Sequence, residues 1–162
     1  GGYGNSWGYF SLGLSGNFWS STSINNSTAP SYTLEYDNSI ISYNTGNGIE
    51  VDHVDDFQIN DSEISHNQRG IHVRDGDLRV NNTTISNNSG DTIECGGILF
   101  SGSNLFLDNV IIRSNTSWSN PGICIDEGLT ASLTNVTIKD NVATQWGCPL
   151  YIFHCGIIQF KI

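Results

Sequence analysis

The sequence predicts an all-β solenoid of about five to six coils, built from short parallel strands. The chain has 162 residues, of which only 14% are charged, while Gly (18), Asn (19) and Ser (20) are abundant. This composition excludes a coiled coil or a charged helical bundle and is typical of a turn-rich β protein. The decisive observation is an eleven-residue pattern that occurs five times, each copy followed by a second short apolar strand.

The five copies share apolar residues two positions apart, interrupted twice by Asn or Asp. They read LEYDNSIISYN from Leu34, FQINDSEISHN from Phe57, LRVNNTTISNN from Leu78, LFLDNVIIRSN from Leu105 and ASLTNVTIKDN from Ala131. The second strands read GIEV from Gly48, GIHV from Gly70, GILF from Gly97, GICI from Gly122 and PLYI from Pro149. A period of two predicts strands with one face inward. Because one coil cannot bury its own apolar face, the coils are expected to stack.

The recurring polar residues predict side-chain ladders at two inward bends. One column contains Asn38, Asp61, Asn82, Asn109 and Asn135, and the other contains Asn44, Asn67, Asn88, Asn115 and Asn141. Stacked amides can bond to the same amide of the next coil. Among eight N-x-S/T triplets, we therefore expect Asn82, Asn115 and Asn135 to be structural, and Asn60 and Asn81 to be the better candidates for glycosylation.

The tandem I-x-x-N and G-I-x-[VI] segments, with Gly96-Gly97-Ile98-Leu99, resemble the repeat of the right-handed parallel β-helix. The resemblance covers residues 34 to 162. That family includes pectin- and alginate-degrading enzymes, phage tailspikes, autotransporter passengers and polymorphic outer-membrane repeat proteins, and the last two groups are the more similar. The resemblance implies a single-stranded right-handed β-helix and leaves open whether the chain is an enzyme or an adhesin.

The charge and the cysteines limit the partners and the compartment. A net charge of −10 argues against nucleic acid and against an anionic membrane surface, and no apolar run is long enough for membrane insertion. The four cysteines fit no paired zinc pattern. One or two disulfides in an oxidising compartment, or buried thiols, are the alternatives for Cys95, Cys124, Cys148 and Cys155. Together with the N-x-S/T triplets, this favours a secreted or cell-surface protein.

Apolar residues near both ends and on two loops predict an interaction surface. Residues 1–33 are rich in Gly and aromatic residues and form either a cap on the first coil or a segment that docks on another subunit. A sixth, incomplete coil is expected near residue 158, with apolar side chains at an open sheet edge. The predicted contact residues are Tyr3, Trp7, Tyr9, Phe10, Trp118, Trp146, Ile158, Phe160 and Ile162.

The only patch that could carry catalysis combines Glu50, Asp52, His72 and Arg74, which the repeat places on one outer face of adjacent coils. In that register, Asp52 and Arg74 share a column with Ser101, Asp126 and Phe153. A solvated face with weak salt bridges is the alternative, and a hard cation such as calcium at the bend of Asp55 and Asp56 is a third. We expect no cofactor and no metal site.

The function predicted from these observations is structural or adhesive. We expect an extracellular module that self-associates, end to end, into a homo-oligomer, filament or larger surface assembly. The alternatives are a polysaccharide lyase or glycoside hydrolase using the Glu50 face, or a carbohydrate-binding module using the Trp loops.

Overall fold

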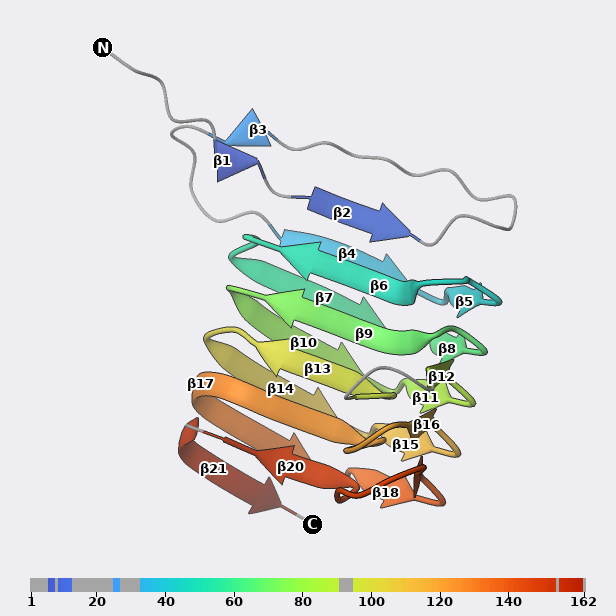
Figure 1. Cartoon of the computed structure of the whole chain (residues 1–162). Helices are drawn as coiled ribbons and strands as arrows, with labels where there is room; N and C mark the ends of the chain where they lie inside the picture. The colour runs from blue at the N-terminus through green and yellow to red at the C-terminus, as the bar shows by residue number, and fades with distance from the viewer. Residues whose placement is uncertain are drawn as a thin grey trace.

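The computed structural model describes residues 6–7, 9–12, 25–26, 33–90, 95–153 and 155–161, with side chains from residue 38 onward. Every regular element within these ranges is a strand, numbered β1 to β21 along the chain. Figure 1 shows that the coils from β4 to β21 follow one another along a single axis. No helix that could cross a membrane is found in this part of the chain. The predicted all-β solenoid is confirmed.

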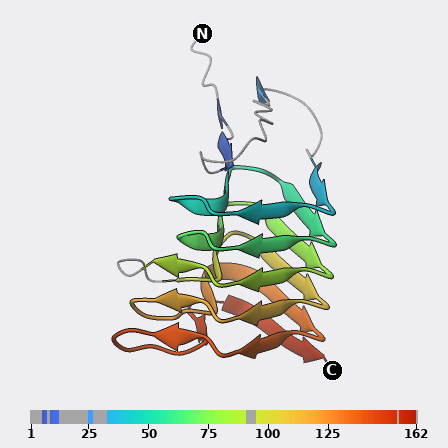
Figure 2. The same cartoon turned by 90° about the vertical axis from the view of Figure 1, so that its right-hand side faces the viewer.

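The repeated isoleucines lie on one wall of the solenoid, a five-stranded parallel sheet. Its strands are β5 (Ile40–Ser42), β8 (Glu63–Ser65), β11 (Thr84–Ser86), β15 (Ile111–Arg113) and β18 (Thr137–Lys139). Their register pairs Ile41, Ile64, Ile85, Ile112 and Ile138 in one column. Figure 2 shows these strands as stacked rungs. About four turns separate the first rung from the last, so the coil count differs slightly from the expected five to six.

An eleven-stranded sheet forms the other two walls. One wall contains β6 (Asn47–Asp52), β9 (Arg69–Arg74), β13 (Ile98–Ser101) and β20 (Leu150–Ile152). The second contains β4 (Thr33–Asp37), β7 (Asp56–Asn60), β10 (Asp77–Asn81), β14 (Asn104–Asp108) and β21 (Cys155–Lys161). The twelve-residue strand β17 (Ile123–Thr134) belongs to both walls, because it pairs with β13 and with β14.

The remaining strands are short. β12 (Ser89–Gly90), β16 (Thr116–Ser117) and β19 (Val142–Ala143) form a three-stranded sheet after the second Asn column. Near the N-terminus β1 (Ser6–Trp7) pairs with β3 (Asn25–Asn26), and β2 (Tyr9–Leu12) pairs antiparallel with β6. Strand β2 therefore lies along the outer edge of the first coil (Figure 1).

The core consists of columns of like side chains that point into the solenoid. Ile49, Ile71, Ile98 and Ile123 are paired in register and are all 0% exposed. Each such side chain contributes about 1.5–3 kcal/mol through its burial, and this contribution requires a neighbouring coil on each side. The alternating pattern in the sequence therefore specifies the inward face of each strand.

The column from Asn44 to Asn141 is a continuous hydrogen-bonded ladder. The backbone N–H and the Nδ2 of Asn44 donate to Oδ1 of Asn67 over 3.1 and 2.8 Å, and each later member donates in the same way to the next one. The Nδ2 of Asn88 also donates to the carbonyl oxygen of Ile64, in the coil before it. Every buried amide thus has partners in both directions along the axis.

The other Asn/Asp column has a different role from the one expected. Its members Asn38, Asp61, Asn82, Asn109 and Asn135 are exposed and have φ between 47° and 54°. Asn and Asp tolerate this left-handed backbone better than most residues, which explains why they recur there. Some of these side chains still form hydrogen bonds with their neighbours in the column: Asn82 Nδ2 donates to Asp61 Oδ1 over 3.2 Å. These side chains lie at an outer corner and not at an inward bend.

One outward column also departs from the register that the repeat predicts. Ser101 pairs with Glu127 and not with Asp126, because the register shifts by one residue after Phe100. Asp126 is the extra residue in this β-bulge. The bulge lies within β17, at the point where this strand turns from one wall to the other.

Candidate functional site

The structure brings together the four residues of the predicted outer patch. Glu50 pairs in register with His72, and Asp52 pairs with Arg74, across the parallel strands β6 and β9. All four alternate with inward residues such as Val51 and Val73, which are 0% exposed. The patch therefore lies on the outer side of the wall that β6 and β9 form in the first two coils.

Arg74 binds the carboxylates of the neighbouring coil. Its Nη2 lies 2.7 Å from Glu50 Oε1, and its Nε lies 3.8 Å from Asp52 Oδ2. Burial alone would raise the pKa of Glu50, but the hydrogen bond and positive charge of Arg74 outweigh it, so that this pKa lies below its ordinary value. Glu50 is thus an ion-pair partner rather than a proton donor at neutral pH.

His72 lies behind this ion pair, with a side chain that is only 12% exposed. Its Nδ1 is 3.4 Å from Nη1 of Arg69 and 3.5 Å from Nη1 of Arg74. Burial, followed by the charges of these two arginines, lowers the pKa of His72 to about 4. The imidazole is therefore neutral at pH 7 and a weak base, which makes it poorly suited to general acid–base catalysis.

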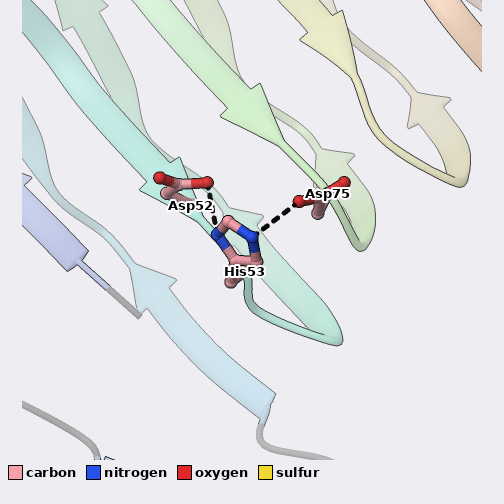
Figure 3. Close-up of side chains that lie close together, drawn as sticks. All are labelled: Asp52, His53 and Asp75. Carbon is pink, nitrogen blue, oxygen red and sulfur yellow. Dashed lines mark ion pairs between the residues drawn. The ribbon is translucent and has the colours of Figure 1, made fainter. Parts of the chain in front are cut away.

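Asp52, His53 and Asp75 form a second cluster at the adjoining corner (Figure 3). Nδ1 of His53 lies 2.7 Å from Asp52 Oδ1, and Nε2 lies 3.1 Å from Asp75 Oδ2. His53 and Asp75 occupy equivalent corners of successive coils, both with φ near 60°. The imidazole ring consequently lies between a carboxylate of its own coil and one of the next.

This corner contains the one group in the described chain whose side chains could together hold a cation. One ligand atom from each of Asp52, His53 and Asp75 falls within 4.8 Å of the others. Two of these side chains are well exposed (His53 57%, Asp75 64%), and the imidazole already contacts both carboxylates. The buried Oδ1 of Asp52 nevertheless has no hydrogen bond of good geometry, although it lies close to His53. The three side chains therefore form an ion-pair cluster in which His53 bridges the carboxylates of Asp52 and Asp75.

Sequence reasoning missed Asp75, which the equivalence of the two corners could have identified. It also placed Asp55 and Asp56 together at one acidic bend, but the structure directs them differently. Asp56 opens strand β7 and binds Arg79, with Oδ1 3.0 Å from Nε, while Asp55 is exposed. Arg79 also lies 4.1 Å from the ring centre of Phe106. This second ion pair lies on another wall of the solenoid.

The comparison with protein families agrees with this architecture. The family described as "Right handed beta helix region" matches residues 14–161, which is most of the chain. The chain belongs to the right-handed β-helix family. No curated protein and no solved structure matches it.

The later coils of the β-helix carry exposed aromatic side chains. Trp118 (40% exposed) and Trp146 (70%) meet edge to face, with ring centres 5.9 Å apart, and Tyr151 stacks on Phe153. Of the other predicted contact residues, Phe160 is exposed and Ile158 is half-buried. Tyr3 and Ile162 lie outside the described residues, as do the side chains of Trp7, Tyr9 and Phe10.

The glycosylation candidates lie on strand ends of the β-helix. Asn60 and Asn81 are half-buried, and Asn81 Nδ2 donates to Asn60 Oδ1 over 2.8 Å. Of the triplet asparagines expected to be structural, Asn115 is buried in the ladder, whereas Asn82 and Asn135 are exposed. Glycosylation remains a prediction at Asn60 and Asn81.

The four predicted disulfide candidates are all described, and no bond joins any two of them. Cys95 and Cys124 are buried, Cys155 is half-buried and Cys148 is exposed. The insertions that carry them therefore differ: the part around Cys95 folds down on the β-helix, while the part around Trp146 and Cys148 faces solvent.

Proposed function

We propose that this β-helix is a structural or adhesive module that associates end to end with copies of itself. The observation that carries the proposal is the exposure of Phe160 at a core position. Phe160 continues the column of Ile59, Val80, Leu107 and Leu133. Those four are at most 3% exposed, whereas Phe160 is 65% exposed. An apolar side chain at this position gains stabilisation when a further coil covers it.

The polarity of the Asn ladder supports a head-to-tail arrangement. Each member donates to the next coil and accepts from the coil before it. At the last coil, the backbone N–H of Asn141 has no such acceptor among the described residues. At the first coil, Asn44 Oδ1 has no donor among them. The ladder thus offers a donor at the last coil and an acceptor at the first, and a heterologous contact of this kind extends into a filament. Strand β2 occupies the β6 edge of the first coil, so the contact is made through β4 and β5, which pair only with β7 and β8 among the described strands.

The predicted extracellular or cell-surface location and a carbohydrate partner belong to the same proposal. The enzymatic alternative has less support, because Arg74 engages Glu50 and Asp52 while His72 is a weak base. The exposed Trp118 and Trp146 suit a contact with either a protein or a sugar.

The test is sedimentation velocity and negative-stain electron microscopy of the purified chain over a concentration series. Oligomers or filaments should form, and Phe160→Asp should reduce the apparent association constant at least tenfold by placing a charge in the contact. Ile40→Asp is the matched control, because Ile40 is 75% exposed but faces outward from β5. A chain that stays monomeric at every concentration would overturn the proposal, as would equal effects of both substitutions.

A further inference from the structure

Cys95 and Cys124 are both buried where the third coil meets the fourth. Cys95 directly precedes Gly96 and Gly97, and Cys124 is the second residue of β17. The backbones of the two coils are in register here, since Gly97 N donates to Pro121 O and Ile98 N to Gly122 O, both over 2.9 Å. Cys95 has the largest influence on the pKa of the Cys124 thiol, which it raises, in keeping with two neighbouring side chains.

The burial of Cys124 is unusual for its position. It alternates with the inward Ile123 and Ile125 and so points outward, yet it is only 4% exposed. Cys95 is 0% exposed. Cys95 Sγ lies 2.9 Å from Ile98 O and 4.0 Å from Gly122 O, while Cys124 Sγ lies 3.6 Å from Asn120 O. Both sulfur atoms are therefore enclosed beside the same turn of the fourth coil.

We propose that Cys95 and Cys124 form a disulfide that fastens the insertion after Asn88 to the fourth coil. Two thiols lose two protons and two electrons as the S–S bond forms. The electrons reduce an external disulfide, such as a thiol–disulfide exchange catalyst or oxidised glutathione, to two thiols. Exchange proceeds through a mixed disulfide with one of the two cysteines.

The enclosure of the two sulfur atoms determines when the bond forms. The neighbouring Cys95 thiol, together with burial, raises the pKa of Cys124, so the attacking thiolate is scarce in the folded chain. The bond therefore forms during folding, before Cys95 and Cys124 become buried. Once formed, it is shielded from reductants in the folded chain. Cys148 and Cys155 lack this enclosure, because Cys148 is exposed and Cys155 is only half-buried.

The positions of the basic residues make the pairing measurable. Trypsin cleavage after Arg79, Arg113 and Lys139 places Cys95 in peptide 80–113 and Cys124 in peptide 114–139, while Cys148 and Cys155 share peptide 140–161. The full chain is refolded with a mixture of reduced and oxidised glutathione, alkylated at low pH, digested and analysed by mass spectrometry without reduction. The expected product is 80–113 joined to 114–139. Both peptides recovered as alkylated thiols, or either joined to 140–161, would overturn the proposal.

A second measurement tests the consequence for stability. The oxidised chain should melt roughly 5–10 °C above the reduced chain, since a cross-link restricts the unfolded state. Cys95→Ala should lose this difference between oxidising and reducing conditions, whereas Cys148→Ala should keep it. An equal response of both variants would contradict the assignment. Dithiothreitol should cleave the bond only when denaturant opens the fold, and rapid cleavage in the native chain would contradict the enclosed site.

Discussion

At the scale of single residues, the Asn ladder shows how a polar side chain specifies a stack. Asn88 is 0% exposed, accepts from Asn67, and donates to Asn115 and to the carbonyl oxygen of Ile64. Only an amide can donate and accept at the same time in this geometry. A carboxylate of the same shape lacks the donors, and a hydroxyl is too short to reach both coils.

We therefore expect Asn88→Ala to lower the free energy of unfolding by about 3 kcal/mol or more, because it leaves several buried groups without partners. Urea denaturation at pH 7 measures this loss. Asn87→Gly is the control: Asn87 is exposed with φ 54°, a backbone that glycine adopts without strain, and the expected change is below about 1 kcal/mol. Similar losses in both variants would show that the ladder adds little.

His72 predicts how stability depends on pH. Its pKa is about 4 in the folded chain against 6.5 in the unfolded chain, so the unfolded chain binds the proton more tightly. Stability is therefore highest above pH 6.5 and falls as the pH decreases towards 4, by about 2 kcal/mol between pH 7 and pH 5. The lowered pKa of Glu50 acts in the same direction, but only below its ordinary value of 4.5.

Urea midpoints measured at pH 7 and pH 5 test this expectation. His72→Asn removes the titrating group, and the stability of this variant should fall less than that of the wild type over the same interval. An unchanged pH dependence in the variant would mean that other groups control the acid response.

At the scale of elements, the glycine that begins the first four of the five second strands sets the spacing of the coils. A Cβ on Gly97 would lie 2.2 Å from the carbonyl oxygen of Gly122, and one on Gly122 would lie 2.0 Å from that of Pro149. These neighbours are backbone atoms that cannot rotate away. The G-I start of the repeat is thus required by the close approach of the next coil, and not by a left-handed turn.

Gly97→Ala should consequently destabilise the protein by about 3 kcal/mol, since the clash forces β13 and β17 apart. Gly46→Ala is the matched control, because nothing lies within 4 Å of a Cβ at Gly46. Thermal unfolding followed by circular dichroism measures both. A Gly97→Ala variant as stable as the Gly46→Ala variant would show that the coils can move apart at little cost.

The strands could be predicted from the sequence because each is a short local pattern that recurs in register. The inward columns, such as Ile41 to Ile138, follow from the repeat alone. The bulge at Asp126 could not be predicted, since one extra residue in a continuous strand leaves no local signal. The column from Asn38 to Asn135 was wrongly predicted to lie at an inward bend. Asn is favoured both at a corner with left-handed backbone and in a buried amide ladder, so the residue type alone does not distinguish the two positions.

The candidate site was predictable in part for the same reason. Glu50, Asp52, His72 and Arg74 share a face because period two and the register place them there. Their chemistry depends on distances that the repeat does not encode, such as the approach of Arg69 to His72. The position of Cys95 beside Gly122 is likewise not encoded by the repeat, because Cys95 belongs to the insertion after Asn88.

At the scale of the whole molecule, the two ends of the β-helix differ. Strand β2 covers the outer edge of β6 in the antiparallel sense, whereas β20 and β21 pair only with β17 among the described strands. Unpaired edges are the usual sites of β-sheet association. Among the described strands, β2 therefore covers the edge of β6 in the first coil, while the edge of β20 in the last coil is open.

Deleting residues 1–12 therefore tests whether the N-terminal segment is a cap or a docking element. If β2 is a cap, its removal exposes the β6 edge, and the weight-average mass at a fixed concentration should rise in sedimentation experiments. Deleting residues 1–8 is the control, because it leaves β2 (Tyr9–Leu12) in place and should change the mass little. If the segment instead docks on another copy, deleting residues 1–12 should lower the mass, and the end-to-end contact would then require this segment as well as the open coil.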